Sequence, residues 1–252
     1  MNLRAHLPDI EAAAVRGWPA LETAPFNGWL WRHSSGGSTR ANSVAALAFT
    51  GHDPVTAIAA VEAHCQARHL AVCFTVSDVS LPTGLDAHLE ARGYARGDSC
   101  VTMAKNVDAT TALPVDVEVA TQPTVQWMTV YLSGLSENRR AAAPHIIERL
   151  PTGAMFISAS TDGQVTSSGL TVGDGSVASV QCMATLQAAQ RRGGAQRVLQ
   201  TIEHLAARDG RRALYLQTGE DNVAARSLYA RAGYSEIGRY HTRTLVFEQP
   251  RK

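Results

Sequence analysis

The sequence predicts an α/β (α+β) protein built from two similar units in tandem. First, a helix followed by a Gly-Tyr pair occurs twice, as "LEARGY" at residues 89–94 and as "YARAGY" at residues 229–234. Second, the strand and helix patterns before each copy follow the same order, which indicates an internal duplication. Third, the small, polar, Pro-containing segment 106–122 is typical of a linker or of the entry strand of a second unit. We therefore expect two domains, residues 1–108 and residues 109–252.

Composition limits what the chain does. With 252 residues, 45% hydrophobic and 18% charged, the chain is globular and long enough to bury a sizeable core. A net charge of +1 without a long basic run argues against nucleic acid or a membrane surface as the main partner. No stretch approaches the roughly 20 apolar residues of a membrane span, and the N-terminus has no apolar signal core, so we expect a cytoplasmic protein. The four cysteines lack CxxC spacing, which favours buried thiols over a metal site.

The first unit is expected to have the order β-β-α-β-α-β. Alternating large apolar and polar residues predict two strands around a Gly-Ser turn, and apolar residues at helical spacing predict the first helix. Gly93 is the expected stop of the second helix. In chain order, these elements are two strands within 28–49, a helix at 55–70, a strand at 71–78, a helix at 83–93 and a strand at 99–105.

The second unit repeats the last part of this order after a pair of helices. Its longest helix has apolar residues from Ala195 to Ala206 on one face and Gly210 as the expected stop. In chain order, the expected elements are two helices within 125–150, strands at 154–160, 166–174 and 176–186, the helix from 195, a strand at 213–218, a helix at 222–233 and a pair of strands within 234–248.

The turn before the helix that starts near residue 195 carries chemistry. Gln190-x-x-Gly193-x-Ala195 places a polar side chain, a glycine and a small residue where that helix begins. The first turn of a helix leaves N–H groups unpaired and carries partial positive charge, so small residues there let a phosphate approach closely. Arg191 and Arg192 add positive charge beside the turn. Neither a Walker motif nor a dinucleotide-binding Gly-x-Gly-x-x-Gly fits it, and a plain turn without a ligand is the alternative.

A second motif follows one strand later. Residues 222–234 carry Asn222-x-x-Ala225-x-x-Leu228-Tyr229-x-x-x-Gly233-Tyr234. In this order, with a strand between them, the two motifs resemble the acetyl-CoA signature of the GNAT superfamily of acyltransferases. The resemblance covers roughly residues 115–247. It implies a mixed, mostly antiparallel sheet flanked by helices, acetyl-CoA as cosubstrate and no metal.

Carried over residue by residue, the resemblance implies a cofactor site and a general acid. Backbone N–H groups of the Gly-rich turn would bind the CoA pyrophosphate, and the strand before it would pair with the pantetheine arm where it splays from the strand at 213–218. Asn222 would bond to the CoA chain. Tyr229 would protonate the leaving thiolate, for which a phenol is chemically suited, whereas without the motif it would be a core tyrosine. The cofactor-binding residues implied in this way are Met183, Thr185, Gln190, Arg191, Arg192, Gly193, Gly194, Ala195, Gln196 and Asn222.

The general base stays open. Many relatives use a glutamate on the strand before the Gly-rich turn, but the corresponding residue here is Ser179. An amine that arrives already neutral is one alternative. The side chains that could act directly or through water are Glu137, His145, Glu148 and His241.

The first unit lacks these groups. Leu89 matches Tyr229 when counted from the shared glycine, Asn222 has no counterpart, and Pro54 stands where the phosphate turn would be. The segments "WPALE", "GWLWR" and "RANSV", together with the closing "YHTR", resemble tandem GNAT proteins with a degenerate N-terminal half, a group that includes an N-acetylglutamate synthase type. This half either packs against the other or closes over the acceptor site. Arg139 and Arg140 are candidates for pairing with an acceptor carboxylate, or are solvated helix-start arginines.

We therefore predict direct acetyl transfer from acetyl-CoA to a primary amine of a small molecule or amino acid, without a metal or a covalent enzyme intermediate. The alternatives are an N-acetylglutamate synthase-like amino-acid acetyltransferase and a non-catalytic acyl-CoA-binding regulatory module. We expect no nucleic-acid or membrane partner, and the sequence is compatible with a homodimer.

Overall fold

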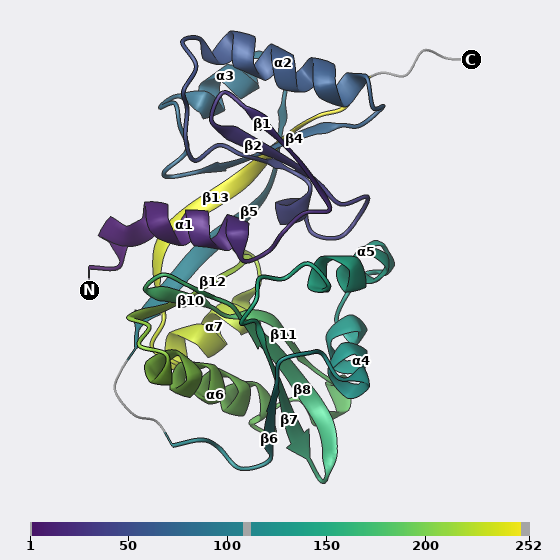
Figure 1. Ribbon diagram of the computed structural model, residues 1–252, viewed down its shortest axis with the longest axis vertical. Coiled ribbons are helices and arrows are strands. Elements are labelled where there is room, and N and C mark those ends of the chain that lie inside the picture. The colour runs from purple at the N-terminus through teal and green to yellow at the C-terminus, as the bar shows by residue number, and fades with distance from the viewer. Residues whose placement is uncertain (1, 108–111, 248–252) are drawn as a thin grey trace.

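The computed structural model describes residues 2–107 and 112–247, which form a mixture of helices and strands (Figure 1). The helices are α1 (Leu7–Arg16), α2 (Pro54–Gln66), α3 (Leu85–Ala91), α4 (Val125–Ser133), α5 (Glu137–Ile147), α6 (Gly194–Arg208) and α7 (Val223–Arg231), with short 3-10 turns η1 (Arg4–His6), η2 (Thr39–Ala41) and η3 (Gln187–Ala189). The strands are β1 (Glu22–Phe26), β2 (Trp29–His33), β3 (Val44–Ala45), β4 (Val72–Ser77), β5 (Ala95–Asn106), β6 (Val117–Ala120), β7 (Met155–Thr161), β8 (Gln164–Thr171), β9 (Gly173–Asp174), β10 (Val177–Ser179), β11 (Gln181–Thr185), β12 (Ala213–Gly219) and β13 (Ser235–Leu245).

The strands form two sheets. One has nine strands in the order β1-β2-β3-β4-β13-β5-β12-β10-β9, and the other has four in the order β11-β8-β7-β6. Neighbours are antiparallel except for β3 with β4 and β10 with β12. The mixed, mostly antiparallel α/β architecture predicted from the sequence is confirmed.

Two long strands join the halves of the molecule. β5 and β13 pair antiparallel, so that Ser235 lies opposite Ala104 and Thr244 opposite Ala95. β13 also pairs with β4, and β5 also pairs with β12, so each strand belongs to both halves and both run through the centre of Figure 1. The predicted boundary between residues 108 and 109 lies outside the described residues, and the nine-stranded sheet contains strands from both sides of it.

The expectation of a strand pair within 234–248 is wrong. Through residue 245 the segment is one strand, β13, which continues across the centre instead of folding back. The physical reason is that β4 and β5 lie open on either side and offer this strand two sets of backbone partners along its length. Bulges at Glu236/Gly238 and His241/Arg243 bend the strand between them.

The helices before β5 and β13 end in the same way. Gly93 and Gly233 adopt positive φ values of 82° and 89°, which glycine reaches at no steric cost. The N–H of Tyr94 donates to the Leu89 carbonyl at 3.1 Å, and the N–H of Tyr234 donates to the Tyr229 carbonyl at 3.0 Å. Both ends are therefore Schellman caps, and the geometry places Leu89 and Tyr229 at matching positions.

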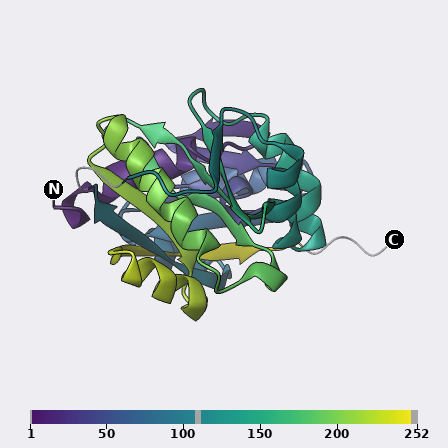
Figure 2. The ribbon, with the colours of Figure 1, turned by 90° about the horizontal axis from the view of Figure 1, so that it is seen from below.

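Helices cover both faces of the smaller sheet. Alternate residues of β7 point to opposite faces: Ile157 packs with α6 and Phe156 with α4 and α5. From below, α6 and the α4–α5 pair flank this sheet on opposite sides (Figure 2). Neither α1 nor β1 was predicted from the sequence. α1 packs on β5, β10, β12 and β13 of the nine-stranded sheet. Within the described residues, no helix has the length and apolar character to cross a bilayer.

Candidate active site

The two neighbouring strands at the centre of the second half separate from one another. β10 pairs in parallel with β12 as far as Ser179 opposite Tyr215, and Val180 donates its N–H to the Tyr215 carbonyl at 2.7 Å. The chain then bulges at Cys182, whose φ is 51°, and continues as β11, which pairs with β8 instead. β11 and β12 therefore diverge at the bulge, and a gap opens between them, as the resemblance to the GNAT superfamily implied.

A cleft of about 530 Å³ occupies this gap. Of the predicted site residues, Met183, Asn222 and Tyr229 line it, whereas Thr185 and the turn from Gln190 to Gln196 do not. Thr185 is the last residue of β11 and the turn follows it, so both come after the part of the strand that lines the cleft. The walls also contain Trp18 and residues 37–40 of the first half, Tyr131, Leu135 and Arg139 of the α4–α5 region, Gln217 of β12, Asp98 and Cys100 of β5, and Tyr240 and Thr242 of β13.

The backbone of β11 faces the gap with unpaired groups. Leu186 donates its N–H to the Thr166 carbonyl of β8 at 2.9 Å. Successive residues of a strand direct their N–H groups to opposite edges, so those of Met183 and Thr185 point away from β8. This edge is suited to an extended ligand that adds to it as a strand would.

The Gly-rich turn leads into an uncapped helix. Gly193 is the N-cap of α6, and no side chain bonds to the first-turn N–H groups there. A Cβ on Gly194 would lie 2.1 Å from Ser167 Oγ, so glycine is what lets α6 begin directly against β8. Arg191 and Arg192 are exposed beside the turn, and Arg192 pairs with Asp162 at 2.8 Å. The arrangement offers backbone donors and positive charge to an anion.

The matching helix of the first half is closed to an anion. The Asp53 side chain accepts hydrogen bonds from the N–H groups of Val55 and Thr56 at the start of α2, and Pro54 has no N–H. A hydrogen bond from the Thr56 hydroxyl, together with these two backbone bonds, holds the pKa of Asp53 below its usual value, so this helix start carries a negative charge. A phosphate would be repelled there, which agrees with the predicted loss of a CoA site in this half.

Tyr229 lines the cleft. The residue is 7% exposed, and its ring meets the Tyr234 ring edge-on with 5.9 Å between the ring centroids. No hydrogen bond joins its hydroxyl to another residue within the described parts of the chain. Burial raises the pKa of Tyr229 to about 12, so the phenol is protonated at neutral pH.

Asn222 has a structural role as well. Its Oδ1 accepts the Ala225 N–H at 3.1 Å and caps α7. Its side-chain NH₂ group has no hydrogen bond within the part of the chain that the structure describes, and therefore can donate to a ligand.

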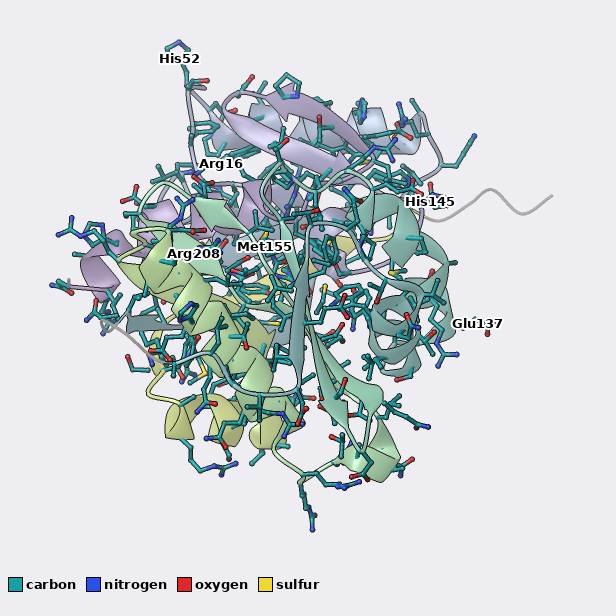
Figure 3. The ribbon with its side chains drawn as sticks, turned by 60° about the horizontal axis from the view of Figure 1, so that its bottom comes forward. Arg16, His52, Glu137, His145, Met155 and Arg208 are labelled. Carbon is teal, nitrogen blue, oxygen red and sulfur yellow. The ribbon has the colours of Figure 1, made fainter. Side chains whose placement is uncertain are left out.

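The side chains named as candidate bases do not line the cleft. Figure 3 shows Glu137 and His145 on the outer side of α5, and His145 lies 3.8 Å from Glu148 there. His241 bonds to Asp86 at 2.7 Å and lines a separate pocket of about 350 Å³. Ser179 is fully buried, and its Oγ accepts hydrogen bonds from the Val172 N–H and from Gln181 Nε2.

Several cleft residues were not singled out from the sequence. Gln217 is a polar residue near the end of a buried strand, a signal that could have been used, and Asp98 lies within a strand of unexceptional pattern. Tyr240, the first residue of the "YHTR" segment noted in the sequence, also lines the cleft. Asp98 is the carboxylate that the described residues contribute to the cleft wall. Arg40 and Arg139 were noted, and both line the cleft; Arg140 instead donates to the Leu135 carbonyl at 2.8 Å.

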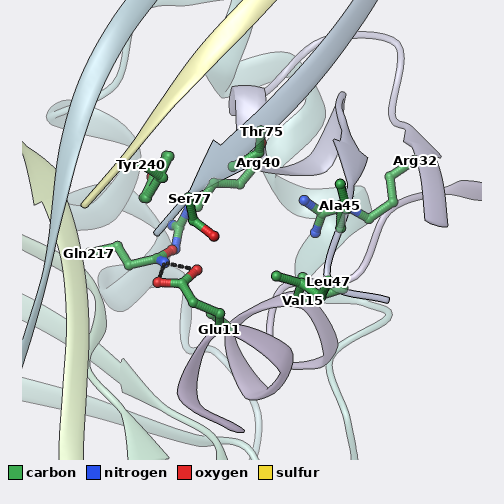
Figure 4. Close-up of a pocket in the computed structure, with 12 residues that line it drawn as sticks. Glu11, Val15, Arg32, Arg40, Ala45, Leu47, Thr75, Ser77, Gln217 and Tyr240 are labelled. Carbon is green, nitrogen blue, oxygen red and sulfur yellow. Dashed lines mark hydrogen bonds between the residues drawn. The ribbon is translucent and has the colours of Figure 1, made fainter. Parts of the chain in front are cut away.

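A smaller cavity of about 20 Å³ adjoins the cleft, and Arg40, Thr75, Gln217 and Tyr240 line both. Its polar walls also include Glu11, which accepts hydrogen bonds from Gln217 and Thr102. Burial raises the pKa of the Glu11 carboxyl despite these bonds. Arg32 reaches into the cavity from the side opposite Gln217 (Figure 4).

Known proteins resemble this chain over most of its length. Residues 5–243 match the family described as "Probable histone acetyltransferase Rv0428c C-terminal". The chain is 29% identical over 244 residues to the uncharacterized N-acetyltransferase YobR of Bacillus subtilis (strain 168), covering 93% of this chain and 96% of that protein.

Solved structures share the fold. A GCN5-related N-acetyltransferase from Kribbella flavida superposes with a TM-score of 0.65 at 15% identity, over 96% of each chain. A tandem GNAT protein from the clavulanic acid biosynthesis pathway superposes with a TM-score of 0.60 at 16% identity, over 98% of this chain and 96% of that one.

Proposed function

The chain belongs to this acetyltransferase family and is a GNAT-type N-acetyltransferase, and on that basis we propose that it transfers the acetyl group of acetyl-CoA directly to a primary amine of a small molecule or amino acid. The observation that carries the proposal is Tyr229. Its protonated hydroxyl, without a protein partner in the described chain, lies in the wall of a cleft between two separating strands. The helix that follows β11, α6, starts without a side-chain cap, so its first N–H groups are available to the CoA pyrophosphate.

In the proposed complex, the chain holds acetyl-CoA by its backbone. N–H groups from Arg191 to Gln196 bind the pyrophosphate, the free edge of β11 at Met183 and Thr185 pairs with the pantetheine arm, and the Asn222 NH₂ group donates to the same arm. The thioester supplies the acetyl group. These donors are preorganised because α6 starts directly against β8 and the bulge at Cys182 opens the strand.

Tyr229 acts as the general acid. The amine nitrogen attacks the thioester carbonyl, the carbon–sulfur bond breaks, and the phenol gives its proton to the leaving sulfur. Because burial raises the pKa of Tyr229 to about 12, the phenol holds its proton at neutral pH and can give it to the sulfur.

Proton removal from the amine has two candidate routes. Asp98 is a cleft carboxylate that can accept the proton, directly or through water. An amine that enters in its neutral form needs no base. The remote positions of Glu137, His145 and Glu148 favour these routes over the bases first considered.

We also propose the tandem-GNAT arrangement, with residues 1–108 as a degenerate unit and residues 109–252 as the catalytic unit. The matching Schellman caps support a duplication, and Leu89 in place of Tyr229, fully buried, supports the loss of chemistry in the first unit. The first unit contributes Trp18 and residues 37–40 to the cleft, which supports a role in closing over the acceptor.

The test is an acceptor screen with acetyl-CoA. Release of free thiol is followed for a panel of small primary amines, all common amino acids including glutamate, and a lysine-containing histone-tail peptide, since the family description names histones. We expect transfer to at least one small amine or amino acid, with an acetylated product of the expected mass. Transfer to the peptide alone would overturn the small-molecule acceptor. Tight acetyl-CoA binding by calorimetry without transfer to any member would favour a non-catalytic CoA-binding module.

A further inference from the structure

Residues of the proposed thioester site and two arginines line the same cleft. Met183, Ala225 and Tyr229 are among the lining residues, and so are residues 37–40 of the first half and Leu135 and Arg139 of the α4–α5 region. The two arginines, Arg40 and Arg139, therefore come from different halves of the chain and share a cleft with Tyr229.

Arg40 is held in place with most of its donors free. Asn42 fixes the loop that carries it, since its side chain accepts the Ser34 N–H at 2.8 Å and donates to the carbonyls of Gly36 and Ser38 at 2.6 and 3.0 Å. The guanidinium lies 5.8 Å from the Trp18 ring. A guanidinium has five N–H donors, but one hydrogen bond is formed here, from Nη1 to Gln217 Oε1 at 3.3 Å. No carboxylate lies within 4.0 Å of it in the described chain.

A second guanidinium, that of Arg32, lies buried near Arg40. Arg32 is 4% exposed, and it donates to the carbonyl and Oγ of Ser43 at 3.4 Å without forming an ion pair with any described residue. Burial, followed by the positive charge of Arg40, lowers the pKa of Arg32 to about 10. The neighbouring acid, Glu11, gives limited compensation, because its own pKa is raised by burial. A second anionic group near Arg40 would relieve this imbalance.

Arg139 of α5 also lines the cleft. It is exposed, and it forms no hydrogen bond or ion pair with the residues that the structure describes. Its charge and that of Arg40 both favour ionisation of the same two side chains, Tyr131 and Cys182, although burial dominates and raises the pKa of each. The positive charges of both guanidinium groups are therefore felt at Cys182, the bulge where the cleft opens.

We propose that Arg40 and Arg139 bind a carboxylate of the acceptor, so that the acceptor is an amino acid or another amine that bears an acid group. This proposal rests on the proposed acetyltransferase function and deepens it. A planar carboxylate matches the fork of a guanidinium and can bridge two of them, and the bond is charge-assisted. With the acid held by the two arginines, the amino group of a compact substrate extends within the same cleft toward Tyr229.

Matched sets of acceptors test the proposal on the intact protein. Each set has one side chain in three forms: the L-amino acid, its uncharged carboxamide, and the amine without the group. Phenylalanine, phenylalaninamide and 2-phenylethylamine form one set, and the corresponding compounds of histidine, tryptophan and lysine form three more. We expect kcat/KM for the preferred amino acid to exceed that of its carboxamide and amine by at least about tenfold, the effect of one charge-assisted hydrogen bond.

Arginine variants locate the effect. In Arg40→Gln, we expect KM for the amino acid to rise about 10- to 100-fold with little change in the KM for acetyl-CoA, while kcat/KM for the amine changes less than about threefold. Arg139→Gln should shift the same parameters in the same direction. It also keeps the test informative if the partly buried Arg40 variant does not fold, because Arg139 is exposed. Arg149→Gln is the control for lost charge, since Arg149 is exposed and does not line the cleft.

The outcomes are distinguishable. Equal use of amino acids and their amines, or transfer to amines alone, would overturn the carboxylate subsite and leave the acetyltransferase proposal intact. An amino-acid preference that survives both arginine variants would overturn the assignment to these residues. No transfer to any member of any set would overturn the subsite together with the small-molecule acetyltransferase proposal.

Discussion

Replacing Tyr229 with phenylalanine removes the proposed general acid and little else. The hydroxyl forms no hydrogen bond with the described residues, so none is lost from the fold. The ring keeps its buried position and its edge contact with Tyr234 at 5.9 Å. We therefore expect the free energy of unfolding to change by less than about 1 kcal/mol, because no partner is left unsatisfied.

The expected loss of activity is much larger. Proton transfer by a positioned side chain contributes about 10²- to 10⁴-fold, which corresponds to about 3–5 kcal/mol of transition-state stabilisation. Because the pKa of Tyr229 is raised to about 12, the wild-type acid stays protonated throughout the neutral and mildly basic range. The loss in Tyr229→Phe should therefore be nearly constant from pH 6 to pH 9, and it should fall on kcat rather than on the Kd for acetyl-CoA.

Tyr234→Phe is the matched control. Tyr234 is 5% exposed, follows Tyr229 in the same motif and does not line the cleft. We expect it to retain the wild-type kcat within about threefold, since it removes a buried phenol that does not line the cleft. The assay is thiol release with an acceptor found in the screen, together with urea unfolding of all three proteins. A Tyr229→Phe enzyme with wild-type kcat at saturating substrates would refute the general-acid assignment.

Three further perturbations test other parts of the reasoning. Burial raises the folded-state pKa of Glu11 above its ordinary value of about 4.5, so the folded chain binds an extra proton and its stability declines as pH rises above that value. In Glu11→Gln, this decline of stability with rising pH should disappear. Urea midpoints that run parallel for the two proteins from pH 4 to pH 8 would contradict this. Gly194→Ala would place a Cβ 2.1 Å from Ser167 Oγ, so α6 would have to shift. We expect the free energy of unfolding in urea to fall by about 1–3 kcal/mol and calorimetry to give weaker binding of acetyl-CoA. Unchanged values would show that this close approach is unimportant. Asp53→Ala should lower the unfolding midpoint by uncapping α2, yet calorimetry should still give one acetyl-CoA per chain, and a second site would show that the first half retains CoA binding.

Local patterns were sufficient for most individual elements. The helix α6 follows from apolar residues repeating at helical spacing and from Gly210, whose φ of 69° ends it. The repeated Gly-Tyr pair predicted two matching helix ends, and the Schellman caps at Gly93 and Gly233 confirm the correspondence of Leu89 with Tyr229. These features depend on contacts within a few residues of each other, so the sequence alone determines them.

The pairing of the long strands could not be predicted in this way. A strand pattern at 234–248 is compatible with a hairpin or with one long strand, because side-chain alternation specifies the faces of a strand and leaves its neighbours open. The choice depended on β4 and β5, which are distant in sequence and supply the partners of β13. The same pairing brings Tyr240 and Thr242 to the cleft.

The sequence by itself determined the local motifs of this protein: the Gly-rich turn, the helix of Tyr229, and leucine in place of that tyrosine at position 89 of the first half. The tertiary structure decided which groups share a cleft. Arg40 and Arg139 come from different halves of the chain, Glu137 and His145 point outward, and Gln217 joins the cleft to a buried acid. The physical reason is that a site made of side chains from separate elements depends on how strands cross and helices pack over long sequence separations, whereas turns and caps are set by hydrogen bonds between near neighbours.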